Sequence, residues 1–425
     1  MGWIPICVGL AVLARLAAQL ALDALNQIET RRNEAHCPEA LAGVLDAAEY
    51  SKSVRYALAK GRLSLVASSF DAAVLLALLV SGALPWWWAR ADALAPSAAW
   101  SGALSIVLAM GLLWVVGLPL SWWAQFHLEE RFGFNRSTPA LWAVDHAKFA
   151  LLGLGIGFPA AWAVLALAGW AGLSWWVWGF ALLFGLELLM VVAFPKLILP
   201  LFNRLSPLPD GDLRTRLLSL AERTGFRART IELMDGSKRS GHSNAFFTGF
   251  GRFRRIVLLD TLIAQLSPAE LEAVLAHEIG HYKCGHVPKA LALSALLQFG
   301  GFALVAWLMR THWIAAAFGL PEGALAPVLL LMALFGGVVT FWFVPFGSWL
   351  SRRHEFQADA FARKVIGSSE PMVGALRTLS RRNLSNLTPH PLYSAVFYSH
   401  PTLSERERAL RSEPQSDEVI DLARW

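Results

Sequence analysis

Long apolar segments are the feature that most constrains the fold of this chain. Seven of them reach the roughly 20 residues that a helix needs to cross about 30 Å of hydrocarbon. They lie at 3–24, 65–88, 103–124, 149–171, 174–195, 289–309 and 325–350. A soluble all-helical core does not require runs of this length, and the charged fraction of 16% is below the roughly 25% of soluble domains. The sequence therefore predicts a mainly α-helical, polytopic membrane protein with seven transmembrane helices.

The charges between these segments predict the orientation of the protein. Basic residues gather in two links, Arg31, Arg32, Lys52, Arg55, Lys60 and Arg62 in 25–64 and Arg131, Arg136 and Lys148 in 125–148. The links that alternate with these two along the chain hold at most one basic residue each. The positive-inside rule then places 25–64, 125–148, 196–288 and 351–425 in the cytoplasm. The net charge of +6 fits loops near anionic lipid, and no basic cluster with interleaved aromatic residues indicates a nucleic-acid partner.

The polar segments divide the chain into four blocks. An N-terminal membrane domain with five spans and a cytoplasmic loop at 25–64 occupies 1–195. Two polar blocks, 196–288 and 351–425, are joined by a two-span hairpin at 289–350, which returns them to one side of the membrane. Short apolar runs at 230–234, 244–250 and 254–259 predict a small β-sheet in the first polar block.

A helix with a clear start follows this predicted sheet. Ser267, Pro268 and Glu270 form an N-cap, a first-turn proline and a capping box. The helix contains His277-Glu278-Ile279-Gly280-His281, in which two histidines four residues apart share one face and can bind one metal ion. Glu278 lies beside that position and can hold a water. This arrangement indicates a zinc hydrolase, while the alternative is an exposed polar helix face.

A catalytic zinc ion usually takes three protein ligands, so a third must lie elsewhere. The longer H-E-x-x-H-x-x-G-x-x-H pattern fails because Gly285 and His286 are each displaced by one position. Glu355 is the best candidate, since it follows the last span on the expected side. Asp359 lies on the same helix face and can orient a ligand histidine. The alternative is that Glu355 only pairs with the adjacent arginines at 352 and 353.

Five blocks of sequence resemble one known family, the type I CAAX prenyl proteases, which are seven-span integral membrane zinc metalloproteases. The blocks are S-K-R-S-x-H-S-N-A-F-F at 237–247, R-I-V-L-L-D-T-L at 255–262, H-E-I-G-H at 277–281, E-F-Q-A-D at 355–359 and H-P-x-x-x-x-R at 400–406. The resemblance implies a gluzincin-type metalloprotease domain on the cytoplasmic side of helices that enclose a chamber. It implies one Zn²⁺ per chain and a peptide or protein substrate, prenylated or not.

The resemblance also assigns roles to individual residues. It implies zinc ligation by His277, His281 and Glu355, general-base catalysis by Glu278, and substrate or transition-state contacts from Asn244, His400 and Arg406. An amide such as that of Asn244, at the start of an edge strand, can hold a peptide carbonyl. His400 and Arg406 can donate to an oxyanion. The alternatives are a solvated loop for Asn244 and a polar tail for the other two.

Several questions stay open at this level. A quality-control metalloprotease acting on unprenylated substrates and a non-enzymatic scaffold or transporter are the competing functions. The Ala-, Leu- and Trp-rich spans favour a bacterial inner membrane, with the endoplasmic reticulum membrane as the eukaryotic alternative. No role follows for Arg15, Glu187, His242, His286, His354 or Cys284 beyond a buried thiol for the cysteine. The oligomeric state is not predicted.

Overall fold

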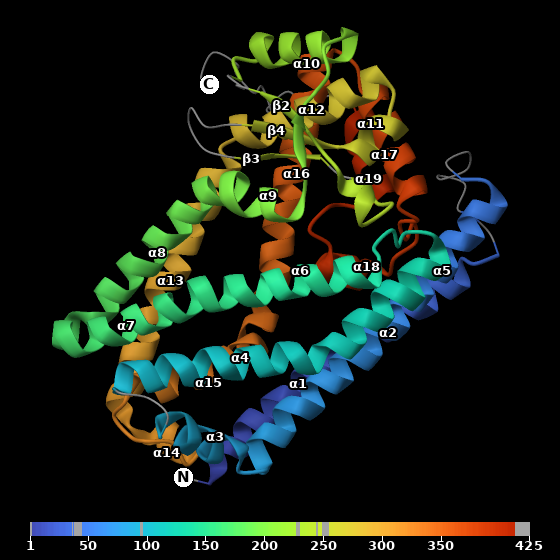
Figure 1. Cartoon of the computed structure of the whole chain (residues 1–425). Helices are drawn as coiled ribbons and strands as arrows, with labels where there is room; N and C mark the ends of the chain where they lie inside the picture. Colours follow the sequence, from blue (N-terminus) through green and yellow to red (C-terminus); the bar gives the residue numbers. More distant parts are fainter. Residues whose placement is uncertain are drawn as a thin grey trace.

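The computed structural model describes residues 2–35, 37, 45–93, 97–226, 230–243, 245–248 and 255–412. Long helices form an elongated bundle, and a compact part of helices and strands lies at one end of it (Figure 1). The bundle contains α1 (Trp3–Arg32), α2 (Ala47–Val80), α3 (Ala83–Asp92), α4 (Ala98–Trp123), α6 (Pro139–Leu152), α7 (Phe158–Ala171), α8 (Trp175–Ala193), α13 (His286–Thr311), α14 (Trp313–Ala317) and α15 (Leu325–Thr340). Helix α16 (Val344–Ile366) runs from the bundle into the compact part.

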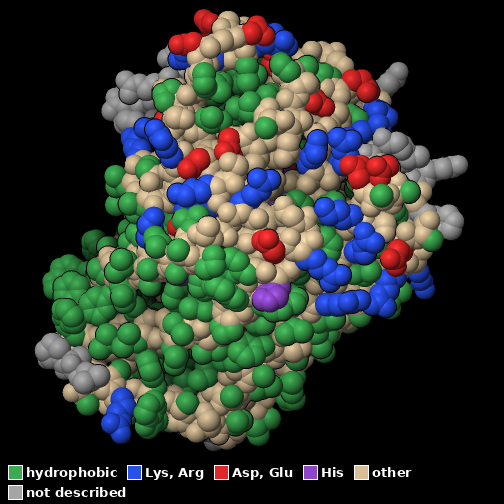
Figure 2. All heavy atoms as spheres, turned by 45° about the vertical axis from the view of Figure 1, so that its right-hand side comes forward, with side chains coloured by type: hydrophobic (Ala, Val, Ile, Leu, Met, Phe, Trp, Pro, Cys, Tyr) green, Lys and Arg blue, Asp and Glu red, His purple; other side chains and the backbone are tan. Residues whose placement is uncertain are grey.

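Six helical segments of the described chain are long and apolar enough to cross a membrane. They are Trp3–Arg32, Ala47–Val80, Ala98–Phe132, Pro139–Phe202, His286–Thr311 and Leu325–Ile366. The fourth contains both predicted spans 149–171 and 174–195, and the chain changes direction between them at Gly172, whose φ is 54°. Two predicted spans thus share one segment, so the count of seven and the enclosed chamber stay predictions. On the face shown in Figure 2, hydrophobic side chains predominate on the bundle, whereas charged ones gather around the compact part.

A four-stranded sheet in the order β1-β2-β4-β3 lies in the compact part. Its strands are β1 (Leu205–Pro207), β2 (Ile231–Met234), β3 (Ala245–Thr248) and β4 (Arg255–Leu259). β2 pairs parallel with β4, while the β1–β2 and β3–β4 pairs are antiparallel. The three strands predicted from the sequence are confirmed, and β1 is an additional one. The predicted turn between β3 and β4 lies outside the described residues.

The helices of the compact part pack with this sheet and carry the sequence motifs. They are α10 (Asp212–Arg223), α11 (Asp260–Gln265), α12 (Pro268–Lys283), α17 (Glu370–Arg382), α18 (Pro391–Phe397) and α19 (Leu403–Arg411). The predicted capping box at the start of α12 is present. Leu271, Leu275 and Ile279 of α12 are buried in a core shared with α10, β2, β4 and α16.

Short elements connect the longer ones. They are the π-helical turns η2 (Ala124–Glu129), η3 (Gly153–Gly157) and η5 (Phe194–Ile198), the 3-10 turns η4 (Gly172–Ser174), η6 (Gly236–Lys238) and η8 (Phe341–Phe343), and the short helices α5 (Glu130–Phe132) and α9 (Leu199–Phe202). Contacts between distant segments fasten the bundle to the compact part. Arg239 binds Asp145 of α6 at 2.7 Å, and Asn386 donates to Thr30 of α1 at 3.0 Å.

Candidate metal centre and active site

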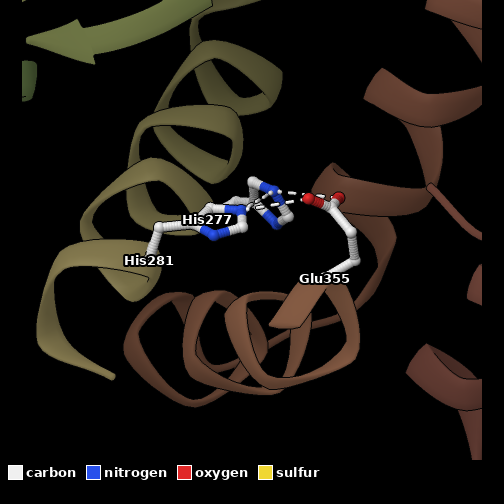
Figure 3. Close-up of side chains that lie close together, drawn as sticks. All are labelled: His277, His281 and Glu355. Carbon is white, nitrogen blue, oxygen red and sulfur yellow. Dashed lines mark hydrogen bonds and ion pairs between the residues drawn. The ribbon is translucent and has the colours of Figure 1, made fainter. Parts of the chain in front are cut away.

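The two motif histidines and Glu355 converge between α12 and α16 (Figure 3). One possible ligand atom from each of the three lies within 4.8 Å of the others. His277 Nε2 is 3.5 Å from Glu355 Oε2, and His281 Nε2 is 3.2 Å from Glu355 Oε1. Helix periodicity places both imidazoles on one face of α12, and the close packing of α12 on α16 brings the carboxylate to them.

This donor set fits a zinc ion. Two imidazoles and one carboxylate are ligands of known catalytic zinc sites, where they leave a position open. Glu355 is buried, and its Oε2 has no hydrogen-bond partner. A buried carboxylate oxygen without a partner is costly, and a bound cation would satisfy it. The alternative was that Glu355 only pairs with Arg352 or Arg353. Among the described residues, its ion pairs are instead with the three histidines His277, His281 and His400 and with Arg406.

Asp359 and Arg406 form a charged layer behind His277. The Asp359 Oδ1 is 2.8 Å from His277 Nδ1, as expected for a carboxylate that orients a ligand histidine. The Arg406 guanidinium donates to both Asp359 oxygens, at 2.8 and 2.6 Å, and its Nη1 is 3.4 Å from Glu355 Oε2. Arg406 is only 7% exposed, so it positions the carboxylates, and its predicted contact with a substrate stays a prediction.

Glu278 lies on the wall of a cavity of about 540 Å³. His281 also lines this cavity, together with apolar residues of α8, η5 and α13, namely Val191, Phe194, Pro195, Val287 and Ala290. Burial raises the pKa of the Glu278 carboxyl, and the imidazoles of His277 and His281 partly oppose this change. A carboxylate with a raised pKa beside an open cavity is suited to accept and return a proton.

The remaining predicted residues differ in what the structure describes of them. His400 is exposed, and its Nε2 is 3.5 Å from Glu355 Oε1, so it lies at the open side of the metal centre. Asn244 lies outside the described residues. The strand that follows it, β3, is at the edge of the sheet and lies next to α12.

His286 is a neighbour of the site for which sequence reasoning found no role. Its Nδ1 is 2.9 Å from His281 Nδ1, and its ring stacks on that of His354. The signal in the sequence was Gly285, which has φ 69° and separates α12 from α13. This left-handed turn brings the first residue of α13 back over the last turn of α12. Cys284 is buried, as predicted.

Comparisons with known proteins agree with this site and fold. Residues 27–204 match the family described as CAAX prenyl protease N-terminal, five membrane helices, and residues 207–414 match peptidase family M48. The CAAX prenyl protease 1 homolog of Arabidopsis thaliana is 37% identical over 392 residues, covering 88% of this chain and 90% of that protein. The CAAX prenyl protease 1 of Saccharomyces cerevisiae is 35% identical over 413 residues, covering 89% of each.

A solved structure shares the fold as well. The crystal structure of S. mikatae Ste24p matches with a TM-score of 0.87 and 32% identity, and the match covers 96% of this chain and 99% of that one. Helices α12 and α16, which carry the candidate site, therefore lie in a fold that this solved structure shares. The chain belongs to peptidase family M48, and it is a multi-pass integral membrane zinc endopeptidase.

Proposed function

We propose that His277, His281 and Glu355 hold the zinc ion and that Glu278 is the general base for peptide hydrolysis. The observation that carries this proposal is the convergence of the three donors within 4.8 Å at a cavity whose wall contains Glu278. A zinc ion bound there supplies Lewis acidity, which polarises a carbonyl and lowers the pKa of water towards about 7.

The residues of the chain have separate tasks in this reaction. Glu278 removes a proton from the attacking water and returns it to the leaving amine, because a carboxylate can act first as base and then as acid. His400, on the open side of the site, donates to the oxyanion that develops on the substrate carbonyl. Asp359 and Arg406 keep His277 and Glu355 in place. Asn244 holds a substrate peptide that extends along the edge of β3.

We propose that the substrates are peptides that end in a prenylated CAAX sequence. The relatives from Arabidopsis thaliana and Saccharomyces cerevisiae are named CAAX prenyl protease 1 homolog and CAAX prenyl protease 1. The cavity beside Glu278 supports this choice, because its wall of Val191, Phe194, Val287 and Ala290 suits aliphatic side chains next to the scissile bond. Unprenylated membrane peptides are the second candidate. They are favoured if the chain resides in a bacterial inner membrane, the location that its span composition supports.

We also propose that the active site faces the cytoplasm. The basic link 25–64 begins on α1, which contacts the compact part through Thr30 and Asn386. The link 125–148 contacts it through Asn135 and Ser240 and through Asp145 and Arg239. Both links therefore lie on the active-site side, and the positive-inside rule assigns that side to the cytoplasm.

The four sequence blocks 1–195, 196–288, 289–350 and 351–425 remain the proposed division of the chain.

Cleavage of matched CAAX peptides by the purified protein in detergent tests the reaction and the substrate class together. A farnesylated peptide and its unfarnesylated twin are compared, with Glu278→Gln and a zinc chelator as controls. We expect cleavage that both controls abolish, while Glu278→Gln keeps one zinc per chain. Activity of Glu278→Gln equal to that of the natural chain would remove the proposed base. Equal cleavage of both peptides would reject recognition of the prenyl group but keep the endopeptidase.

Labelling of an introduced cysteine tests the orientation. Leu173 is 76% exposed in the turn between α7 and α8, and Leu173→Cys is expected to react with a membrane-impermeant thiol reagent added outside intact cells. Protection of this residue until the cells are opened would reverse the proposed orientation.

A further inference from the structure

A chain of hydrogen bonds leads away from the proposed ligand His281 and ends at an amide. His281 Nδ1 is 2.9 Å from His286 Nδ1, and His286 Nε2 is 2.9 Å from Gln357 Oε1. His286 is 5% exposed, and its ring lies flat on His354, with centroids 4.0 Å apart and planes 12° apart. Burial, stacking and these hydrogen bonds therefore hold His281, His286 and Gln357 in one arrangement beside the candidate metal centre.

The chemistry of the donors and acceptors fixes the direction of this chain. The amide oxygen of Gln357 can only accept, so His286 must carry a proton on Nε2. A neutral His286 then has a lone pair on Nδ1 and accepts from Nδ1–H of His281. His281 is left with a lone pair on Nε2, the atom that faces Glu355 at 3.2 Å. The opposite direction would put a proton on His281 Nε2 and block it as a ligand.

The two motif histidines thus have different supports. His277 is backed by the Asp359 carboxylate, which is itself paired with Arg406. His281 is backed by two neutral side chains, His286 and Gln357. A carboxylate behind a ligand histidine raises its basicity, whereas a neutral acceptor fixes the tautomer and the ring orientation without adding charge.

We infer that His286 and Gln357 are positioning residues that hold His281 in the tautomer and orientation required for zinc binding. This inference rests on the proposed role of His281 as a ligand. Among the described residues, the hydrogen bonds of His286 and Gln357 lead to His281 and not to His277 or Glu355, so we expect their effect to reach the metal through His281. Replacing either residue is expected to lower the zinc affinity more than it lowers the stability of the fold.

Zinc affinity of the full-length protein, measured in detergent by competition with a chromophoric chelator, tests the inference. His286→Phe preserves the flat ring and the stacking on His354 but removes both hydrogen bonds, and we expect zinc affinity about 10- to 100-fold lower. Thermal unfolding of the zinc-free form checks that the variant is folded. His354→Phe is the matched control, because it keeps an aromatic ring stacked on His286 and leaves the hydrogen bonds of His286 intact. The zinc affinity of this variant is expected to be unchanged.

Variants of Gln357 separate the effect of hydrogen bonding from that of packing. They test the inference if His286→Phe fails to fold. Gln357→Glu retains an acceptor and is expected to keep at least the natural zinc affinity, whereas the zinc affinity of Gln357→Leu is expected to be several fold lower. Natural affinity in His286→Phe, or equal affinities for Gln357→Glu and Gln357→Leu, would overturn the inference. His281→Ala distinguishes this failure from failure of the proposed function: if that variant keeps natural zinc affinity, His281 is not a ligand.

Discussion

Replacing Gly280 by alanine tests whether a fixed spacing between α12 and α16 sets the geometry of the metal centre. A Cβ at this position would lie 3.0 Å from both the Cα and the O of Ala358 and 3.2 Å from the Cβ of Phe361. Ordinary contacts begin at 3.4 Å, so the helices must separate by about 0.4 Å, the difference between 3.4 and 3.0 Å. Two of these neighbours are backbone atoms, which cannot rotate out of the way.

The expected change in the free energy of unfolding of Gly280→Ala follows from two opposing effects. Overpacking costs about 1–3 kcal/mol, and the better helix propensity of alanine returns at most about 1 kcal/mol. We expect a net loss of about 1–2 kcal/mol, which lowers the melting temperature of a domain of this size by roughly 2–8 °C. Zinc affinity should fall as well, because Gly280 precedes His281 and metal sites tolerate displacements of only about 0.2 Å.

Thermal unfolding and chelator competition on Gly280→Ala measure both effects. Gly300→Ala is the matched control, because Gly300 also lies inside a helix but a Cβ there would meet nothing within 4 Å. The control is expected to keep or slightly raise its melting temperature, because alanine is the better helix former, and to keep its zinc affinity. Gly280→Ala with the stability and zinc affinity of the natural chain would show that the helices adjust freely and that their spacing does not define the site.

Three further changes probe the layers around the metal. Asp359→Ala leaves Arg406 buried without its main partner, and we expect a loss of about 3–5 kcal/mol in thermal unfolding; an unchanged melting temperature would contradict this. His400→Ala should keep its zinc while kcat/KM falls about 100- to 1000-fold, and loss of zinc instead would assign His400 to metal binding. Removing zinc leaves Glu355 Oε2 buried without a hydrogen-bond partner, so the melting temperature should fall and should recover when zinc is returned. The free energy of unfolding should rise by up to about 4 kcal/mol at a zinc concentration 1,000 times Kd; identical melting of both forms would refute a stabilising zinc site.

The parts of the site that depend on helix periodicity could be predicted from the sequence. His277 and His281 are four residues apart, as are Glu355 and Asp359, and each pair lies on one helix face whatever surrounds it. The structure places Asp359 against His277, as predicted. The capping box at Ser267 was equally local, because it needs only the residues of the first helical turn.

Contacts that depend on a change of chain direction could not be predicted in the same way. His286 follows His281 by five residues, and on a continuous helix the two rings would point away from each other. The left-handed Gly285 breaks the helix and reverses this outcome. The contact between Arg406 and Asp359 was not predicted either, because it arises where α19 packs on α16. Such contacts depend on tertiary packing, which local patterns do not contain.

The order of the site along the chain has a consequence for biosynthesis. Two histidines lie on α12, before the membrane hairpin of α13 to α15, whereas Glu355 and Arg406 follow it. A nascent chain therefore carries only two of its three proposed zinc ligands until the last apolar segment is made and Glu355 has left the ribosome. The proposed zinc site can then be completed only late in synthesis.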